Sequence, residues 1–247
     1  MNNPVSIVMS TRNSEKYIER SISSALSQEY DKLEILFFDA DSTDKTFEIA
    51  SKFSGDARIR IFKNSPRKYQ GENIRDGVIM SKPNSIVVTL DGDDWLPHNK
   101  VIQRVNEIYN ENDCWMTYGT YKEFPERSVS HIYEEYPLPV RRKKLFRNYR
   151  WLASHLRTFR RELFLKIREE DLKDPLTGEY FSFAPDLSFQ FPMLEMCGET
   201  RSTYVSDILY VYNVENPNNE NKQDLNEIQR IEKYLRSMVP YETLEKL

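Results

Sequence analysis

Cysteine is scarce in this chain of 247 residues, and its two copies, Cys114 and Cys197, lie far apart in the sequence. This spacing gives neither the disulfide framework of a small secreted domain nor a C-x-x-C metal site. Two isolated thiols are typical of proteins from a reducing compartment. We therefore predict a cytoplasmic location.

Long apolar runs are also missing. No stretch approaches the roughly 20 apolar residues that a membrane-spanning helix needs. Pro4 and Val5 lead into SIVM without the basic segment that opens a signal peptide. We expect no integral membrane segment, so that any lipid-linked partner is met from the water side.

A basic excess is absent as well. The formal net charge is -4, and charged residues of both signs make up 30% of the chain. Binding to nucleic acid depends on clustered positive charge, so we expect no nucleic-acid partner. The three histidines, His98, His131 and His155, share no metal-ligand spacing, and we interpret them as structural.

The first half of the sequence alternates short apolar runs with helical patterns. This alternation predicts βαβ units, and therefore parallel strands joined by crossover helices in one large α/β domain. We expect one helix to open at Ser42 or Thr43 and another to span 72–80. The four strands that we predict span residues 5–9, 33–38, 58–62 and 85–90.

Polar residues gather directly after three of the predicted strands. They form the clusters STRN at 10–13, DADSTD at 39–44 and DGDD at 91–94. Binding sites of parallel sheets lie at the carboxyl ends of the strands. We therefore expect these three clusters to line one site.

The second half of the sequence is less regular. It contains a basic run at 141–150, RRKKLFRNYR, and a predicted strand and helix over 155–167. A break rich in proline and asparagine at 216–221 precedes a predicted terminal helix with an apolar face over 225–238.

The acidic cluster at 91–94 carries the most specific chemistry. Side chains alternate along an extended segment, so Asp91 and Asp93 point to the same side and can reach one divalent cation together. Carboxylates suit hard ions such as Mg²⁺ or Mn²⁺, which can also bind phosphate oxygens at open positions. The alternative is a solvated acidic turn that ends a strand.

The order of these motifs resembles a known family. VSIVMSTRNSEKYIERSISSALSQEYDKLEILFFDADSTDKT followed by IVVTLDGDDWLP resembles the family 2 glycosyltransferases. HLRTFRRELF and FAPDLSFQFPMLEMCGE resemble later segments of the same family. The resemblance implies an α/β fold of the GT-A (Rossmann-like) type, with a mostly parallel central sheet flanked by helices.

The resemblance also implies how the chain is divided. The GT-A glycosyltransferase domain would span 1–215, with a nucleotide-sugar-binding half over 1–100 and a less regular, acceptor-binding half over 101–215. A C-terminal helical cap would follow over 216–247.

A set of donor-binding residues comes with the resemblance. Asp39 matches the aspartate that binds the nucleobase, typically uracil, and Asp41 stands where the family usually has glycine. For Asn73 and Arg75 an ordinary solvated helix face is an equal alternative. The donor-binding residues implied are Thr11, Arg12, Asn13, Asp39, Asp41, Asn73, Arg75, Asp91 and Gly92.

The implied reaction moves one sugar, with inversion, from a nucleotide-diphosphate donor, a UDP-sugar, to a hydroxyl of a glycan acceptor. Mn²⁺ or Mg²⁺ bound by Asp91 and Asp93 would neutralise the leaving diphosphate. Asp186 matches the catalytic base that removes the hydroxyl proton. Glu179 and Glu195 are competing candidates for the base.

Two prolines frame the candidate base. Pro185 suits a helix start, whereas Pro192 predicts a kink or an end of that helix. The alternative role of Asp186 is that of a helix-opening residue that complements the helix dipole.

Other interpretations stay open. The basic run at 141–150 is either a solvated face or a docking strip for an anionic acceptor or for peripheral membrane contact. A sugar-phosphate nucleotidyltransferase would also join an α/β sheet to paired acids, but it would need a glycine- and lysine-rich loop near the N-terminus. A non-catalytic member of the same fold is the third possibility.

Overall fold

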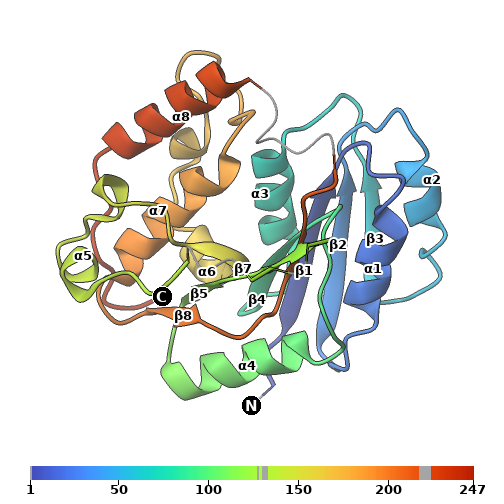
Figure 1. Cartoon of the computed structure of the whole chain (residues 1–247), viewed down its shortest axis with the longest axis horizontal. Helices are drawn as coiled ribbons and strands as arrows, with labels where there is room; N and C mark the ends of the chain where they lie inside the picture. The colour runs from blue at the N-terminus through green and yellow to red at the C-terminus, as the bar shows by residue number, and fades with distance from the viewer. Residues whose placement is uncertain (1, 127, 130–132, 217–223) are drawn as a thin grey trace.

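The chain folds around a seven-stranded sheet with strand order β3-β2-β1-β4-β7-β5-β8, and a second, smaller sheet pairs β6 with β9 (Figure 1). The computed structural model describes residues 2–126, 128–129, 133–216 and 224–247. The strands are β1 (Val5–Thr11), β2 (Leu33–Asp39), β3 (Ile59–Lys63), β4 (Ile86–Asp91), β5 (Met116–Gly119), β6 (Lys122–Phe124), β7 (Ser154–Arg160), β8 (Ser202–Val205) and β9 (Val211–Asn213).

Helices connect the strands. Among the described residues, none of them is both long and apolar enough to cross a membrane. They are α1 (Ile18–Leu26), α2 (Thr46–Ser51), α3 (Gln70–Met80), α4 (Val101–Asn112), α5 (Leu138–Arg142), α6 (Arg161–Phe164), α7 (Pro185–Cys197) and α8 (Leu225–Ser237), with short 3-10 turns η1 (Phe146–Asn148) and η2 (Glu169–Leu172).

The four predicted parallel strands are confirmed. β1 pairs in parallel with β2 and β4, and β2 pairs in parallel with β3. In this register Thr11 lies opposite Asp39, and Ser10 lies opposite Asp91. The ends of three strands therefore bring the three polar clusters to one edge of the sheet.

The helix expected to open at Ser42 or Thr43 begins later, at Thr46. The Asp44 carboxylate accepts a hydrogen bond from the Thr46 backbone N–H at 2.9 Å, and it satisfies a donor of the first turn as a capping residue does. The Ser42 hydroxyl instead accepts from the Asn13 backbone N–H at 3.0 Å. The loop before α2 is thus tied to the end of β1.

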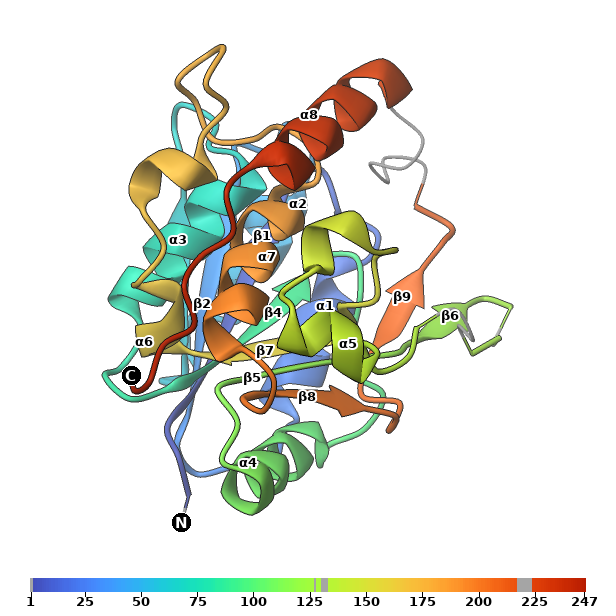
Figure 2. The same ribbon diagram turned by 90° about the vertical axis from the view of Figure 1, so that its left-hand side faces the viewer.

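Helices cover both faces of the sheet. Side chains alternate along β1, so Ile7 packs into the apolar core on one face and Val8 into the core on the other. α3, α6 and α7 cover the face of Val8, and α1 and α4 cover the face of Ile7 (Figure 2).

The second half of the chain extends the same sheet. The predicted strand and helix over 155–167 are confirmed as β7 and α6. β7 lies antiparallel between β4 and β5, and β8 pairs in parallel with β5. The sheet is therefore mostly parallel, and strands from both halves of the chain belong to it.

The prediction that Pro192 kinks or ends its helix is wrong in one respect, because α7 continues past it to Cys197. Every residue of α7 from Leu187 to Cys197 is buried. An interior proline costs roughly 3 kcal/mol or more, and packing on all sides of the helix offsets this cost.

The predicted terminal helix is α8. The Asp224 carboxylate caps it by accepting from two backbone N–H groups of the first turn. Ile231 and Leu235 of its apolar face are fully buried, whereas Leu225 is 61% exposed. The break at 216–221 lies, beyond its first residue, outside the described residues, and the division of the chain at this point stays a prediction.

A buried ion pair fixes α7 against the C-terminal segment. Arg147 donates two hydrogen bonds to the Glu195 carboxylate, at 2.6 and 2.9 Å, and the two side chains are 3% and 0% exposed. Arg147 also donates to the Leu235 carbonyl, and Glu195 accepts from the Tyr241 backbone N–H. These hydrogen bonds therefore hold the carboxylate of Glu195 inside the core.

We predict that Arg147→Leu lowers the free energy of unfolding by about 3–5 kcal/mol, because it leaves the Glu195 charge buried and unpaired. Urea denaturation measures this change. Arg142→Leu is the matched control, since it breaks an exposed pair with Glu199 in which Arg142 is 64% exposed, and it should cost less than about 1 kcal/mol. Equal losses in both variants would contradict the assignment.

Candidate active site

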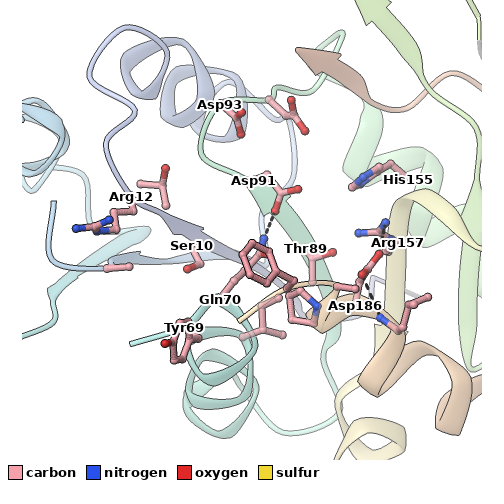
Figure 3. A pocket seen from close by; sticks show the side chains of 18 of the residues that line it. Ser10, Arg12, Tyr69, Gln70, Thr89, Asp91, Asp93, His155, Arg157 and Asp186 are labelled. Atoms are coloured by element: carbon pink, nitrogen blue, oxygen red, sulfur yellow. Dashed lines mark hydrogen bonds and ion pairs between the residues drawn. The ribbon is translucent and has the colours of Figure 1, made fainter. Parts of the chain in front are cut away.

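A cleft of about 870 Å³ opens at the carboxyl ends of β1 and β4 (Figure 3). β7, α7 and α8 also contribute side chains, so both halves of the chain build it. The predicted site residues that line the cleft are Thr11, Arg12, Asn13, Asp91, Asp93 and Asp186. The predicted residues outside its lining are Asp39, Asp41, Asn73, Arg75 and Gly92.

Three carboxylates lie within four residues at the end of β4. All three, Asp91, Asp93 and Asp94, line the cleft, and Asp94 is only 1% exposed. Burial and the charge of Asp93 raise the pKa of Asp91 to about 7. Burial also raises the pKa of Asp93 and, together with the two neighbouring carboxylates, that of Asp94. The cleft floor therefore favours a cation or a proton over three bare negative charges.

Side chains from distant segments hold these carboxylates. Gln70 Nε2 donates to Asp91 at 2.6 Å, and Asn216 Nδ2 donates to Asp93 at 2.7 Å. Asp94 accepts from Tyr210 Oη at 2.6 Å and from the Asn213 backbone N–H at 2.7 Å. The sequence motifs did not single out any of these donors. Together they fix where the acids point.

Asn13 ties the turn after β1 to the loop after β2. It adopts a left-handed backbone conformation with φ 54°, which asparagine tolerates better than most residues. Its side-chain oxygen accepts from the Thr43 backbone N–H at 2.9 Å. Thr11 and Arg12 precede it, and all three residues line the cleft.

Asp39 is the last residue of β2, and Asp41 lies in the loop that follows. Asp39 is fully buried, and its Oδ2 accepts from the Ser42 backbone N–H at 3.0 Å. Its Oδ1 has no hydrogen-bond partner among the described residues, while the next residue, Ala40, lines the cleft. Asp41 has a positive φ of 60°, so the turn keeps the left-handed conformation for which the family uses glycine.

Asn73 and Arg75 have partners away from the cleft. The Asn73 side chain is buried, accepts from Asn64 and donates to the Ser10 hydroxyl at 3.0 Å. Arg75 forms ion pairs with Asp76 and Glu169. The structure thus gives Asn73 a bridging position behind the cleft, and the predicted donor contact of Arg75 would require these ion pairs to open.

Gly92 lies directly after β4, against the last residue of β1. A Cβ atom at this position would be 2.3 Å from Thr11 Cβ and from Thr11 Oγ1. Thr11 belongs to the turn that lines the cleft, so the absence of a side chain at Gly92 lets the turn and the acidic cluster lie side by side.

Asp186 reaches the cleft from the first turn of α7. The helix starts at Pro185, as predicted. Asp186 Oδ2 lies 2.7 Å from Arg157 Nη2, and the two side chains are 24% and 12% exposed. Arg157 comes from β7 and was not predicted. Of the rival bases, Glu195 is paired in the core, and Glu179 is exposed and outside the cleft lining.

The basic run at 141–150 is extensively paired with acids of the same chain. Its ion pairs are Arg141 with Glu135, Arg142 with Glu199, Lys144 with Glu242, Arg147 with Glu195, and Arg150 with Glu134. This pairing neutralises much of the charge that would attract a membrane surface. Peripheral membrane contact at this run stays a prediction without structural support.

The sequence of the chain matches a known protein family over most of its length. The sequence model of Glycosyl transferase family 2 matches residues 6–168 of the chain. The chain belongs to this family. The match contains the acidic cluster and the turns after β1 and β2, and it ends before Asp186, so the candidate base depends on the structure and on the weaker resemblance of its segment.

Curated relatives match this family 2 chain over part of its length. The Escherichia coli protein named UDP-Glc:alpha-D-GlcNAc-diphosphoundecaprenol beta-1,3-glucosyltransferase WfgD is 33% identical over 125 residues, which cover 51% of this chain and 48% of that protein. The chain spans about half the length of the first curated relatives it matches.

Solved structures share the fold of this family 2 chain. Staphylococcus aureus TarS 1-349 in complex with UDP-GlcNAc has a TM-score of 0.69 at 16% identity and covers 94% of this chain and 66% of that chain. Mannosyltransferase PcManGT from Pyrobaculum calidifontis, in complex with GDP-Man and Mn²⁺, has a TM-score of 0.62 at 17% identity, with coverages of 98% and 66%. The predicted GT-A fold is confirmed.

The contact between Gly92 and Thr11 gives a testable prediction. Gly92→Ala should lower the free energy of unfolding by about 1–3 kcal/mol, because the added methyl group forces the two turns apart. Gly55→Ala is the control, since a Cβ atom there meets nothing within 4 Å, and its effect should stay within about 1 kcal/mol. Urea titration of both variants compares them, and a Gly92→Ala protein as stable as Gly55→Ala would refute the close approach.

Proposed function

We propose that this family 2 chain transfers one sugar, with inversion, from a UDP-sugar to a hydroxyl of a glycan, assisted by a divalent metal ion. One observation carries the proposal: Asp91 and Asp93 from the end of β4 share a single cleft with Asp186 from the start of α7. Groups for the leaving diphosphate and for the attacking hydroxyl therefore face the same space.

The chemistry of the acidic cluster suits a hard cation. Asp91 and Asp93 offer carboxylate oxygens into the cleft, and burial, joined at Asp91 by the charge of Asp93, raises their pKa values. A bound cation would offset this cost of holding two negative charges away from water. Within the described residues, no group of three or more His, Cys, Asp or Glu side chains could hold a metal ion. Two carboxylates would leave positions open for phosphate oxygens and water.

Mn²⁺ or Mg²⁺ held by Asp91 and Asp93 would stabilise the charge that develops on the leaving diphosphate. The Mn²⁺ in the structure of PcManGT, a protein of the same fold, supports this cofactor. UDP is favoured as the nucleotide because the curated relative WfgD is named for UDP-Glc and the TarS structure contains UDP-GlcNAc.

The side of the cleft built by the first half of the chain suits a nucleoside diphosphate. Arg12, Arg67 and Lys68 line it, and their charges would attract phosphates. Asp39 lies next to the lining residue Ala40 and has a buried oxygen without a partner among the described residues. A nucleobase N–H would satisfy that oxygen, which supports the predicted role of Asp39.

Asp186 is our candidate base. In the proposed step, the acceptor hydroxyl oxygen bonds to the anomeric carbon while the bond from that carbon to the diphosphate oxygen breaks, and Asp186 takes the hydroxyl proton. Arg157 orients the carboxylate through their 2.7 Å contact. Glu195 cannot serve without breaking its buried pair with Arg147.

The alternatives have less support. A sugar-phosphate nucleotidyltransferase would need a phosphate loop that STRNSEKY does not provide, and the family match favours sugar transfer. A non-catalytic nucleotide-sugar-binding protein would bind UDP without turnover, so the experiments below separate it. The cytoplasmic location and the absence of a nucleic-acid partner stay predictions.

The acidic cluster yields the first functional prediction. Asp91→Asn and Asp93→Asn should each lower the rate of UDP-sugar hydrolysis or transfer by about 10²-fold or more, as the loss of a charge-stabilising group does, and EDTA should abolish activity. Far-UV circular dichroism should stay unchanged. Asp207→Asn is the control, because that carboxylate pairs with Arg104 at the surface. Rates within about threefold of wild type in both cluster variants would exclude the metal role.

The candidate base, Asp186, yields the second functional prediction. Asp186→Asn should lower sugar transfer by about 10² to 10⁴, the usual contribution of a positioned base, while UDP affinity measured by calorimetry stays near normal. Glu179→Gln should leave both quantities unchanged, since that side chain lies outside the cleft lining. Near-normal transfer by Asp186→Asn would mean that another group removes the proton.

A further inference from the structure

An aromatic cluster lines the cleft beside the candidate base, and the proposed reaction has so far given it no role. We define it as Tyr121, Tyr133, Tyr212 and His155, all of which line the cleft. The Tyr121 ring centroid lies 5.5 Å from that of Tyr133, 5.1 Å from that of Tyr212 and 5.8 Å from that of His155. The three tyrosines are partly exposed, so their rings are accessible from the cleft.

The aromatic cluster is built by separate segments of the acceptor-side half. Tyr121 lies between β5 and β6, Tyr212 lies in β9, and His155 lies in β7. The Tyr133 carbonyl accepts a hydrogen bond from Tyr204 Oη at 2.9 Å, which anchors the fourth segment. The two rings that strands hold, Tyr212 and His155, keep their positions without a ligand and can serve as part of a preformed binding surface.

His155 forms the base of the aromatic cluster. It is 6% exposed and stacks on Tyr210, with ring centroids 4.2 Å apart. Its Nδ1 is buried and has no hydrogen-bond partner among the described residues. Leaving a buried polar atom unpaired is costly, so this nitrogen indicates a ligand group or water that completes its bonding.

The charge state of the His155 ring also suits binding of a sugar hydroxyl. Burial and the Arg157 guanidinium lower the pKa of His155 well below its ordinary range, so the ring is neutral at pH 7. A neutral imidazole has one donor and one acceptor nitrogen, and a hydroxyl can match either. His155 and Arg157 lie beside each other at the cleft, with Asp186 next to Arg157 (Figure 3).

The two sides of the cleft differ in charge. Arg12 and Arg67 line the side formed by the first half of the chain, whereas Lys68, also in that lining, pairs with two acids of α3. Among the described lining residues of the second half, Arg157 is the one arginine or lysine, and Asp186 pairs with it. The side with the aromatic cluster therefore offers no unpaired cation for an anionic group, and it favours a neutral ligand.

We propose that the aromatic cluster is the acceptor subsite and that it binds a neutral pyranose ring. The C–H face of the sugar stacks on Tyr121 and Tyr212, as apolar sugar faces do on aromatic rings, and one hydroxyl bonds to His155. A ring held there places a further hydroxyl near Asp186. This inference rests on the proposed glycosyltransferase function and adds the chemical class of its acceptor.

Saturation-transfer NMR tests the subsite with neutral disaccharide probes, lactose and cellobiose, in the presence of UDP and Mg²⁺. Saturation of aromatic protons should pass to the ring C–H protons of a bound probe. Tyr121→Ala and Tyr212→Ala should each weaken probe binding about fivefold to tenfold, while calorimetry shows UDP affinity within about twofold of wild type. Glucuronic acid, an anionic probe, should show weaker saturation than either disaccharide.

Three further variants separate stacking from folding. Tyr212→Phe keeps the ring and should retain most of the probe signal. His155→Phe keeps the stack on Tyr210 but removes both nitrogens, and it should lose binding about as strongly as Tyr212→Ala. Tyr17→Ala removes a partly exposed tyrosine outside the cleft lining and should change nothing. Melting temperatures identify any variant that fails to fold.

Two outcomes would overturn the subsite. In the first, no saturation passes from the wild-type protein to either neutral probe. In the second, the probe spectra recorded with Tyr121→Ala, Tyr212→Ala and His155→Phe match those recorded with wild type. A failure of the proposed function looks different, since wild-type protein would then neither bind UDP nor hydrolyse UDP-sugars. Normal UDP binding with unaffected probe spectra would therefore reject the subsite alone.

Discussion

Burial of three neighbouring carboxylates at the end of β4 is the constraint on which the rest of the site depends. Asp91, Asp93 and Asp94 lie within four residues, and all three have raised pKa values. Each carboxylate accepts a hydrogen bond from a side chain of another segment, and these donors are Gln70, Asn216 and Tyr210. Such outer partners fix how a carboxylate points and how strongly it binds a cation.

Residues of the second half of the chain supply most of these partners. Tyr210 and Asn213, at β9, bond Asp94 from a position 116 or more residues later in the sequence. The same region contributes Tyr212 to the aromatic cluster. One segment thus holds the acids of the donor side and a ring of the proposed acceptor side, and it sets the distance between them.

Local patterns were enough to predict the framework. Alternating apolar runs placed β1 to β4, and polar clusters after those strands placed the cleft, because strand ends of a parallel sheet meet at one edge. The motif spacing also predicted that Asp91 and Asp93 point to the same side, the family resemblance added Asp186, and all three line one cleft. The family resemblance supplied their proposed roles, since spacing alone left a solvated acidic turn open.

Other features depend on contacts that no local pattern encodes. Arg157 follows an ordinary strand pattern, and only the packing of α7 against β7 brings it to Asp186. Pro192 predicted a kink or an end of the helix, but α7 continues past it because every residue from Leu187 to Cys197 is buried. The close contact of Gly92 with Thr11 is likewise seen only in the structure, and its predicted donor role stays a prediction.

A crystal structure of the chain with UDP and Mn²⁺ tests the account most directly. The account predicts Mn²⁺ bound by the carboxylates of Asp91 and Asp93 and by diphosphate oxygens, with the uracil ring beside Asp39 and Ala40. A nucleotide bound outside this cleft, or Mn²⁺ held by residues other than Asp91 and Asp93, would contradict it.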